Sequence, residues 1–148
     1  MVECLPSKQN VDGSSPFRCF VMKTKKFNIT GGKKHEREIA SKAISWCLKN
    51  NVVSPIVGSD INIKLKICKY KTYDCWGTCV DCEDKPWYWS FNMTIANDQS
   101  IRDFVATIMH EMIHVNQYVT EEWDGDGEAE AEYWQYKLAD KFWNSGAM

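Results

Sequence analysis

One apolar stripe dominates the second half of this 148-residue sequence. Between residues 101 and 119, apolar side chains recur at spacings of four, three, four, three and four: Ile101, Val105, Ile108, Met112, Val115 and Val119. This period places them on one face of an α-helix. Ser100 precedes the stripe and Asp103 follows it by three residues, an acidic variant of the capping box. The pattern predicts a buried amphipathic helix that begins after Ser100.

The same helix carries the motif His-Glu-x-x-His at residues 110–114. Residues four apart share a helix face, so His110 and His114 can bind one metal ion. Zinc lowers the pKa of a bound water to about 7. Glu111 would then take a proton from that water and pass it to a leaving amine. The motif predicts a catalytic Zn²⁺ site with Glu111 as the catalytic general base.

A catalytic zinc site needs a third protein ligand, and no His follows His114. The remaining donors are a downstream carboxylate, His35 or a Cys. Glu128, Glu130 and Glu132 open a second amphipathic pattern, whose apolar positions are Ala131, Trp134, Leu138 and Phe142. Counted from Glu130, these lie at +1, +4, +8 and +12, so Glu130 borders the buried face. We therefore expect Glu130 to be the third ligand, with Glu128 and then Glu132 as alternatives.

Weaker patterns suggest the remaining elements. A helix is expected over about 33–50, and strands over 17–23, 61–67 and 87–95. Residues 120–127 are expected to form a loop, and Asp126 or Gly127 to begin the last helix. This order predicts an α+β fold, a small antiparallel or mixed sheet packed on the 101–119 helix and a C-terminal helix. We expect a flexible arm at 1–16 and one domain at 17–148.

Four of the seven cysteines lie in a Cys-rich insert at 68–86: Cys68, Cys75, Cys79 and Cys82. Four thiolates could form a second, structural zinc site. Only Cys79 and Cys82 have the CxxC spacing, so free thiols and one or two disulfides stay open as alternatives. The odd total, without a signal peptide, favours a reducing compartment.

Composition narrows the class of protein. No apolar signal segment follows Met1, and no apolar run approaches the roughly 20 residues of a membrane span. We therefore expect a cytoplasmic protein with no membrane partner. Residues 1–74 hold 14 Lys and Arg against 6 Asp and Glu, a net +8, whereas residues 75–148 hold 4 against 14, a net −10. The basic half gives weak support for a nucleic-acid partner, because its charges are scattered.

Over about residues 87–142 the chain resembles the zincin metallopeptidases. The segments HEMIHVNQY and EAEA resemble the gluzincin branch, short phage and viral metallopeptidases, and ImmA-type peptidases; SprT-type proteins are a looser match. The resemblance implies that His110, His114 and Glu130 bind zinc and that Glu111 is the general base. It also implies that Trp87–Ile95 is a sheet edge that binds substrate, and that Tyr118, Tyr133 or Tyr136 helps to hold the oxyanion.

These features together predict a zinc metallopeptidase that hydrolyses peptide bonds in a peptide or protein substrate, encoded by a virus or a cell. The alternative is a zinc-binding but catalytically inactive domain that serves in protein or DNA binding. The natural substrate and the oligomeric state stay open at this point.

Overall fold

The computed structural model describes residues 25–54, 60–85 and 88–147. Its elements in chain order are β1 (Lys25–Gly31), α1 (Lys34–Lys49), β2 (Asp60–Cys68), α2 (Tyr70–Tyr73), β3 (Gly77–Lys85), β4 (Tyr88–Ala96), α3 (Ile101–Thr120) and α4 (Glu128–Asn144). The strands form one mixed sheet in the order β1-β2-β4-β3. β1, β2 and β4 are parallel, and β3 is antiparallel to β4. The predicted α+β class with a small mixed sheet is confirmed.

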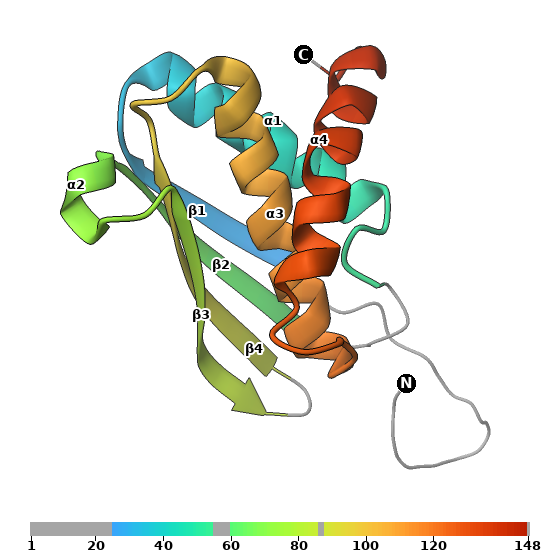
Figure 1. The fold of residues 1–148 in the computed structure, drawn as a ribbon. Helices are drawn as coiled ribbons and strands as arrows, with labels where there is room; N and C mark the ends of the chain where they lie inside the picture. Colours follow the sequence, from blue (N-terminus) through green and yellow to red (C-terminus); the bar gives the residue numbers. More distant parts are fainter. Residues whose placement is uncertain (1–24, 55–59, 86–87, 148) are drawn as a thin grey trace, which may run out of the picture.

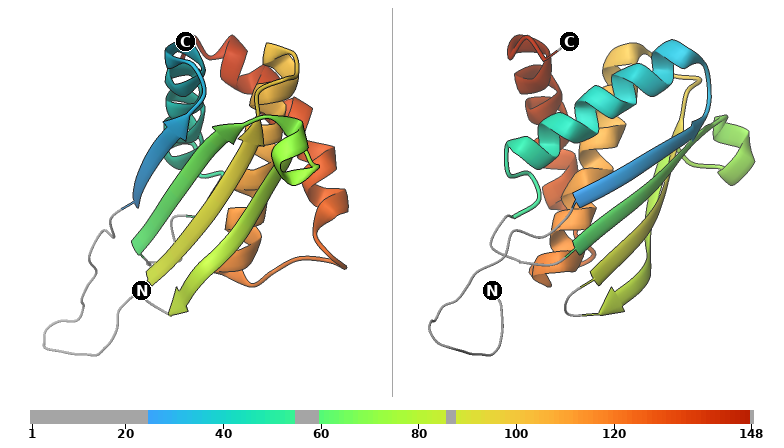
Figure 2. Two further views of the ribbon diagram at one scale, coloured as in Figure 1. Left: turned by 90° about the vertical axis from the view of Figure 1, so that its left-hand side faces the viewer. Right: turned by 180° about the vertical axis from the view of Figure 1, so that it is seen from behind.

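The three long helices α1, α3 and α4 cover one face of the sheet, which gives two layers (Figure 1). Figure 2 shows the sheet in front of these helices in its left view and beside them in its right view, with α2 projecting at one end. β2 illustrates the physical reason. Its four inward side chains, Ile61, Ile63, Leu65 and Ile67, are at most 3% exposed, whereas Lys64 and Lys66 between them are exposed. Strict alternation therefore buries one face of the sheet under the helices.

Helix α3 lies at the centre of the molecule, in contact with α1, α4, β3 and β4. Its predicted N-cap is confirmed, because the Ser100 hydroxyl accepts a hydrogen bond from the Asp103 backbone N–H at 3.1 Å. The predicted stripe is buried except for Ile101, which is 43% exposed at the first turn. Phe104 and Met109, outside the stripe, are also buried. Helices pack against α3 on sides other than the sheet, so burial extends around much of its circumference.

Two other helices also match their predicted positions. The predicted helix over 33–50 is α1, and the predicted last helix is α4, with Ala131, Leu138 and Phe142 buried as expected and Trp134 partly buried. Strand β1 was not predicted, although Phe27 and Ile29 alternate there with polar residues. The predicted arm at 1–16 and strand at 17–23 lie outside the described residues. Within the described ranges, no helix is long and apolar enough to cross a membrane.

The prediction that Trp87–Ile95 forms a sheet edge is wrong. This segment contains β4, which pairs with β2 on one side and with β3 on the other. The edge beside α3 is instead β3, which folds from the Cys-rich segment as the outer arm of a hairpin with β4. A strand pairs on both sides when the chain before it returns alongside it, and periodicity alone does not reveal that pairing.

Candidate metal centre

His110 and His114 lie one turn apart on α3 and point toward the start of α4. Their ring centroids are 4.9 Å apart, and their side chains are 14% and 13% exposed. The motif therefore does what its spacing predicts, because both imidazoles reach one point from a single helix face. Each ring keeps a small accessible edge toward a cleft.

The third donor at this point is Glu128, the first residue of α4. Its Oε1 lies 3.1 Å from His110 Nε2, and its Oε2 lies 2.7 Å from His114 Nε2. The ligand atoms of the three residues all lie within 4.8 Å of one another, so they could hold a metal ion.

Glu130, the third ligand expected from the sequence, does not join this group. Its Oε1 accepts a hydrogen bond from Gln117 Nε2 at 2.7 Å instead. The helical phase correctly identified the buried face of α4, but the two histidines lie at the first turns of that helix, where His110 contacts both Glu128 and Gln135. Side chains on a helix tilt toward its N-terminus, so the first residue projects past the end. Gly127, the N-cap residue with φ of 81°, turns the chain so that Glu128 takes this position.

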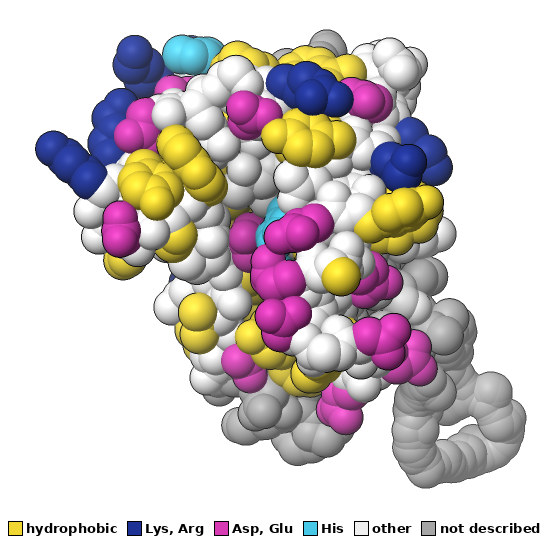
Figure 3. All heavy atoms as spheres, viewed as in Figure 1, with side chains coloured by type: hydrophobic (Ala, Val, Ile, Leu, Met, Phe, Trp, Pro, Cys, Tyr) yellow, Lys and Arg dark blue, Asp and Glu magenta, His cyan; other side chains and the backbone are white. Residues whose placement is uncertain are grey.

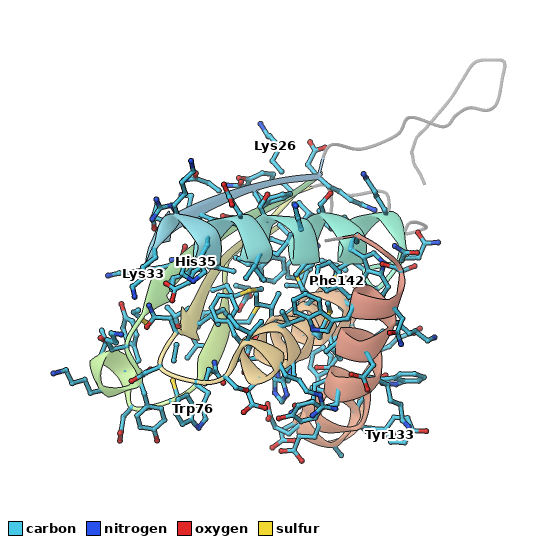
Figure 4. All side chains as sticks on the ribbon, turned by 90° about the horizontal axis from the view of Figure 1, so that it is seen from above. Lys26, Lys33, His35, Trp76, Tyr133 and Phe142 are labelled. Atoms are coloured by element: carbon cyan, nitrogen blue, oxygen red, sulfur yellow. The ribbon has the colours of Figure 1, made fainter. Side chains whose placement is uncertain are left out.

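His35 and Glu132, which could also have supplied the third ligand, lie away from the two histidines. His35 is exposed on α1, and Figure 4 shows it over the start of that helix, away from α4. Glu132 is exposed and lines a neighbouring part of the cleft. The structure thus favours Glu128 over Glu130, Glu132 and His35.

Two glutamines that the sequence analysis missed orient the histidines. Gln135 Oε1 lies 2.7 Å from His110 Nδ1, and Gln117 Oε1 lies 2.8 Å from His114 Nδ1. Each Nδ1–H therefore donates to an amide oxygen, which leaves each Nε2 lone pair facing the carboxylate of Glu128. Lone pairs and a carboxylate repel unless a cation lies between them. A proton or a metal ion satisfies this arrangement. Two imidazole nitrogens and one carboxylate are ligands that suit zinc.

Gln117 also connects the two helices that carry the ligands. This side chain is almost fully buried, and its Nε2 donates to the carbonyl oxygen of Gly127 at 3.0 Å and to Glu130. A Cβ on Gly127 would lie 2.3 Å from Gln117 Oε1, so only glycine permits this approach. Gln117 follows His114 by three residues, so the sequence indicates that the two side chains can meet on one helix face. The contact of Gln117 with Gly127 is visible only in the fold.

Glu111 is 5% exposed and faces the cleft beside the histidines. Burial, with a smaller contribution from the charge of Glu128, raises the pKa of its carboxyl to about 8. The side chain packs against Gly77 of β3, where a Cβ would lie 2.9 Å from Glu111 Oε2 and 2.6 Å from Thr107 Cγ2. A carboxyl with this pKa can accept and return a proton near neutral pH.

The centre lies in a cleft between β3, α3 and α4. Next to the histidines the cavity measures about 520 Å³, and its lining includes Gly77, Thr78 and Cys79 of β3 together with Tyr118 and Trp123. A second cavity of about 700 Å³ shares Gly77, His110 and Glu111 with the first. In Figure 3 the acidic side chains gather in the middle of this face around a visible histidine surface, and Lys and Arg lie toward its margins.

The three tyrosines that were candidates for holding the oxyanion occupy different positions relative to the cleft. Tyr118 lines the cavity beside the histidines, Tyr136 lines the second cavity, and Tyr133 is 61% exposed and lines neither. Burial raises the pKa of Tyr118, so its phenol stays protonated and can donate a hydrogen bond. Tyr118 is the best placed of the three.

The four cysteines of the 68–86 segment, a possible second zinc site, do not gather into a metal-binding group in the structure. The His110, His114 and Glu128 group is the only potential metal site among the described residues, and all four cysteines are free there. They lie on different elements: Cys68 ends β2, Cys75 follows α2, and Cys79 and Cys82 are on β3. Burial raises the pKa of the Cys79 thiol well above its usual value, so this thiol is protonated in the metal-free protein.

Comparison with models of protein families, with curated proteins and with solved structures gives no match for this chain.

Proposed function

We propose that this protein is a zinc-dependent metallopeptidase of the zincin type. The observation that carries the proposal is the convergence of His110 Nε2, His114 Nε2 and the Glu128 carboxylate at one point. Three protein ligands leave one coordination position open, as in catalytic rather than structural zinc sites. The open side faces a cleft large enough for a segment of peptide.

The residues around the centre support hydrolysis. Bound zinc supplies Lewis acidity to a peptide carbonyl and lowers the pKa of the attacking water. Glu111 takes the proton from that water and returns it to the leaving amine, so its carboxyl ends the cycle unchanged. Tyr118 is placed to donate a hydrogen bond to the developing oxyanion.

The position of β3 at the edge of the sheet favours a peptide as the substrate. Its residues Gly77, Thr78 and Cys79 line the cleft, and one side of the strand has no partner strand in the described sheet. An extended peptide can bind such an edge through main-chain hydrogen bonds. We therefore assign to β3 the role that the sequence analysis expected of Trp87–Ile95.

The first test is the zinc content of protein purified without added metal, measured by elemental analysis. We expect one equivalent in the wild type, loss in His110→Ala and Glu128→Gln, and retention in the matched control Glu130→Gln. Absence of zinc that persists after zinc is added would overturn the proposal. Loss of zinc in Glu130→Gln but not in Glu128→Gln would return the third ligand to Glu130.

The second test is hydrolysis of a mixture of random-sequence peptides, followed by mass spectrometry. We expect cleavage by the wild type and none by Glu111→Gln, which should keep its zinc. Equal zinc with no cleavage by either protein would favour the alternative of a catalytically inactive zinc domain that binds protein or DNA.

A further inference from the structure

The second cavity of the cleft has a lining that the metal chemistry does not use. Its volume is about 700 Å³, and it lies beside the centre because both cavities share Gly77, His110 and Glu111. A substrate that reaches the histidines can therefore extend into it. The remaining lining residues are Trp76, Gln99, Asp103, Thr107, Glu132, Gln135 and Tyr136.

Negative charge characterises this lining. Asp103 and Glu132 contribute carboxylates, and no Lys or Arg is among the described residues that line it. Hydrogen bonds from the Tyr136 hydroxyl, at 2.6 Å, and from Ser100 hold the pKa of Asp103 below its usual value. Both helices that border the cavity thus present a carboxylate to it.

The basic side chain of Arg102 lies against Tyr136 but does not line this cavity. Its guanidinium lies 4.4 Å from the centroid of the Tyr136 ring, and its Nη2 lies 3.6 Å from Asp140 Oδ2. Asp140 balances part of its charge, and the same guanidinium also helps to lower the pKa of Asp103 without forming an ion pair with it.

Trp76 contributes an aromatic side chain to the lining. Trp76 is 47% exposed, and its ring packs against Tyr70 with centroids 4.4 Å apart, which holds the indole in place. In Figure 4, Trp76 beside α2 and Tyr133 on α4 lie on either side of α3. An indole face attracts ammonium and guanidinium groups, and carboxylates beside it add to that attraction.

Glu111 lies where the two cavities meet. Its carboxyl is 5% exposed and lines both cavities, and no described residue donates a hydrogen bond to it. A polar group of a ligand can therefore reach this carboxyl from the cleft.

We propose that the second cavity is a subsite for a cationic group of the peptide substrate, either a Lys or Arg side chain or the α-ammonium group of a peptide N-terminus. The proposal rests on the proposed function, because it takes a peptide as the substrate. It adds a specificity that the metal ligands do not provide.

The test measures peptide binding to the zinc-loaded Glu111→Gln protein by fluorescence anisotropy, which separates binding from cleavage. Four labelled peptides of equal length serve as probes: N-acetylated with one Lys, N-acetylated with norleucine in its place, unblocked with norleucine, and N-acetylated with Glu. Norleucine keeps the apolar length of Lys and removes its charge. We expect a cationic probe to bind about tenfold more tightly than acetylated norleucine, and less so at higher salt.

Substitutions then test whether the preference for a cationic probe depends on the second cavity. Asp103→Asn and Glu132→Gln should each reduce the cationic preference, whereas Glu38→Gln, which removes an exposed carboxylate on α1, should not. A preference for the Lys probe indicates a side-chain subsite, and a preference for the unblocked probe indicates recognition of the N-terminus. Equal binding of all probes, no binding of any, or a preference that survives both cavity substitutions would overturn the inference. Random-peptide cleavage without a basic preference would refute the subsite and leave the proposed function intact.

Discussion

The buried carboxyl of Glu111 makes the stability of the metal-free protein depend on pH. Its pKa is about 8 in the folded protein, against 4.5 ordinarily. The folded state therefore holds a proton that the unfolded state has already lost between these values. The free energy of unfolding contributed by the neutral carboxyl is complete below pH 4.5 and is lost as the pH rises through 8.

The size of this effect follows from the pKa difference. At about 1.4 kcal/mol per unit, the rise from 4.5 to about 8 corresponds to about 5 kcal/mol. Whole domains are stable by only about 5–15 kcal/mol, so the metal-free protein should be much weaker at pH 9 than at pH 5. Zinc beside Glu128 should remove most of this loss, because a nearby cation favours the ionised carboxylate.

The assay is urea unfolding of chelator-treated protein at pH 5, 6, 7, 8 and 9, followed by tryptophan fluorescence. Glu111→Gln is the matched control, because glutamine has the shape of the protonated carboxyl but does not titrate. The wild type should lose stability relative to this variant by at most about 1.4 kcal/mol per pH unit. A difference that does not change with pH would refute the argument that burial holds Glu111 neutral.

Three further substitutions test the contacts around the centre. Gly77→Ala places a methyl group 2.9 Å from Glu111 Oε2, so we expect peptide hydrolysis to fall by about tenfold or more while elemental analysis still finds zinc. Gln117→Leu leaves His114 Nδ1 and the Gly127 carbonyl without their partner, and chelator competition should show a zinc affinity reduced by about 10–100-fold. Phe142→Ala removes a fully buried ring, and urea unfolding should show a loss of about 3–5 kcal/mol with unchanged zinc stoichiometry.

Each of these expectations has a contrary outcome. Unchanged hydrolysis in Gly77→Ala would mean that Glu111 does not need its position against β3. Unchanged zinc affinity in Gln117→Leu would show that the orientation of His114 does not depend on this amide. Zinc loss in folded Phe142→Ala would mean that the distant end of α4 controls the placement of Glu128.

The structure confirmed those expectations that depend on neighbouring residues. The spacing of apolar side chains and the Ser100 cap located α3, and the four-residue spacing of His110 and His114 brought both rings to one point. These properties follow from the geometry of a single helix.

Predictions that required the relation between elements were less successful. The resemblance to zincins implied that Trp87–Ile95 is an edge strand, but whether a strand lies at an edge depends on what pairs beside it. The four cysteines are close in sequence, yet a helix and a strand separate them in the fold. Periodicity describes the face of one element and carries no information about its neighbours.

The third ligand shows most clearly what the sequence determines and what the tertiary structure determines. The sequence by itself determined the helix that carries the HExxH motif, the shared face of its two histidines, and the buried face of α4. Only the tertiary structure decided between Glu128 and Glu130. That choice depends on how the loop after Thr120 leads into α4 at Gly127. It also depends on the hydrogen bonds of Gln117 to Gly127 and Glu130. Such contacts join residues on different elements, and a helical repeat within one segment cannot encode them.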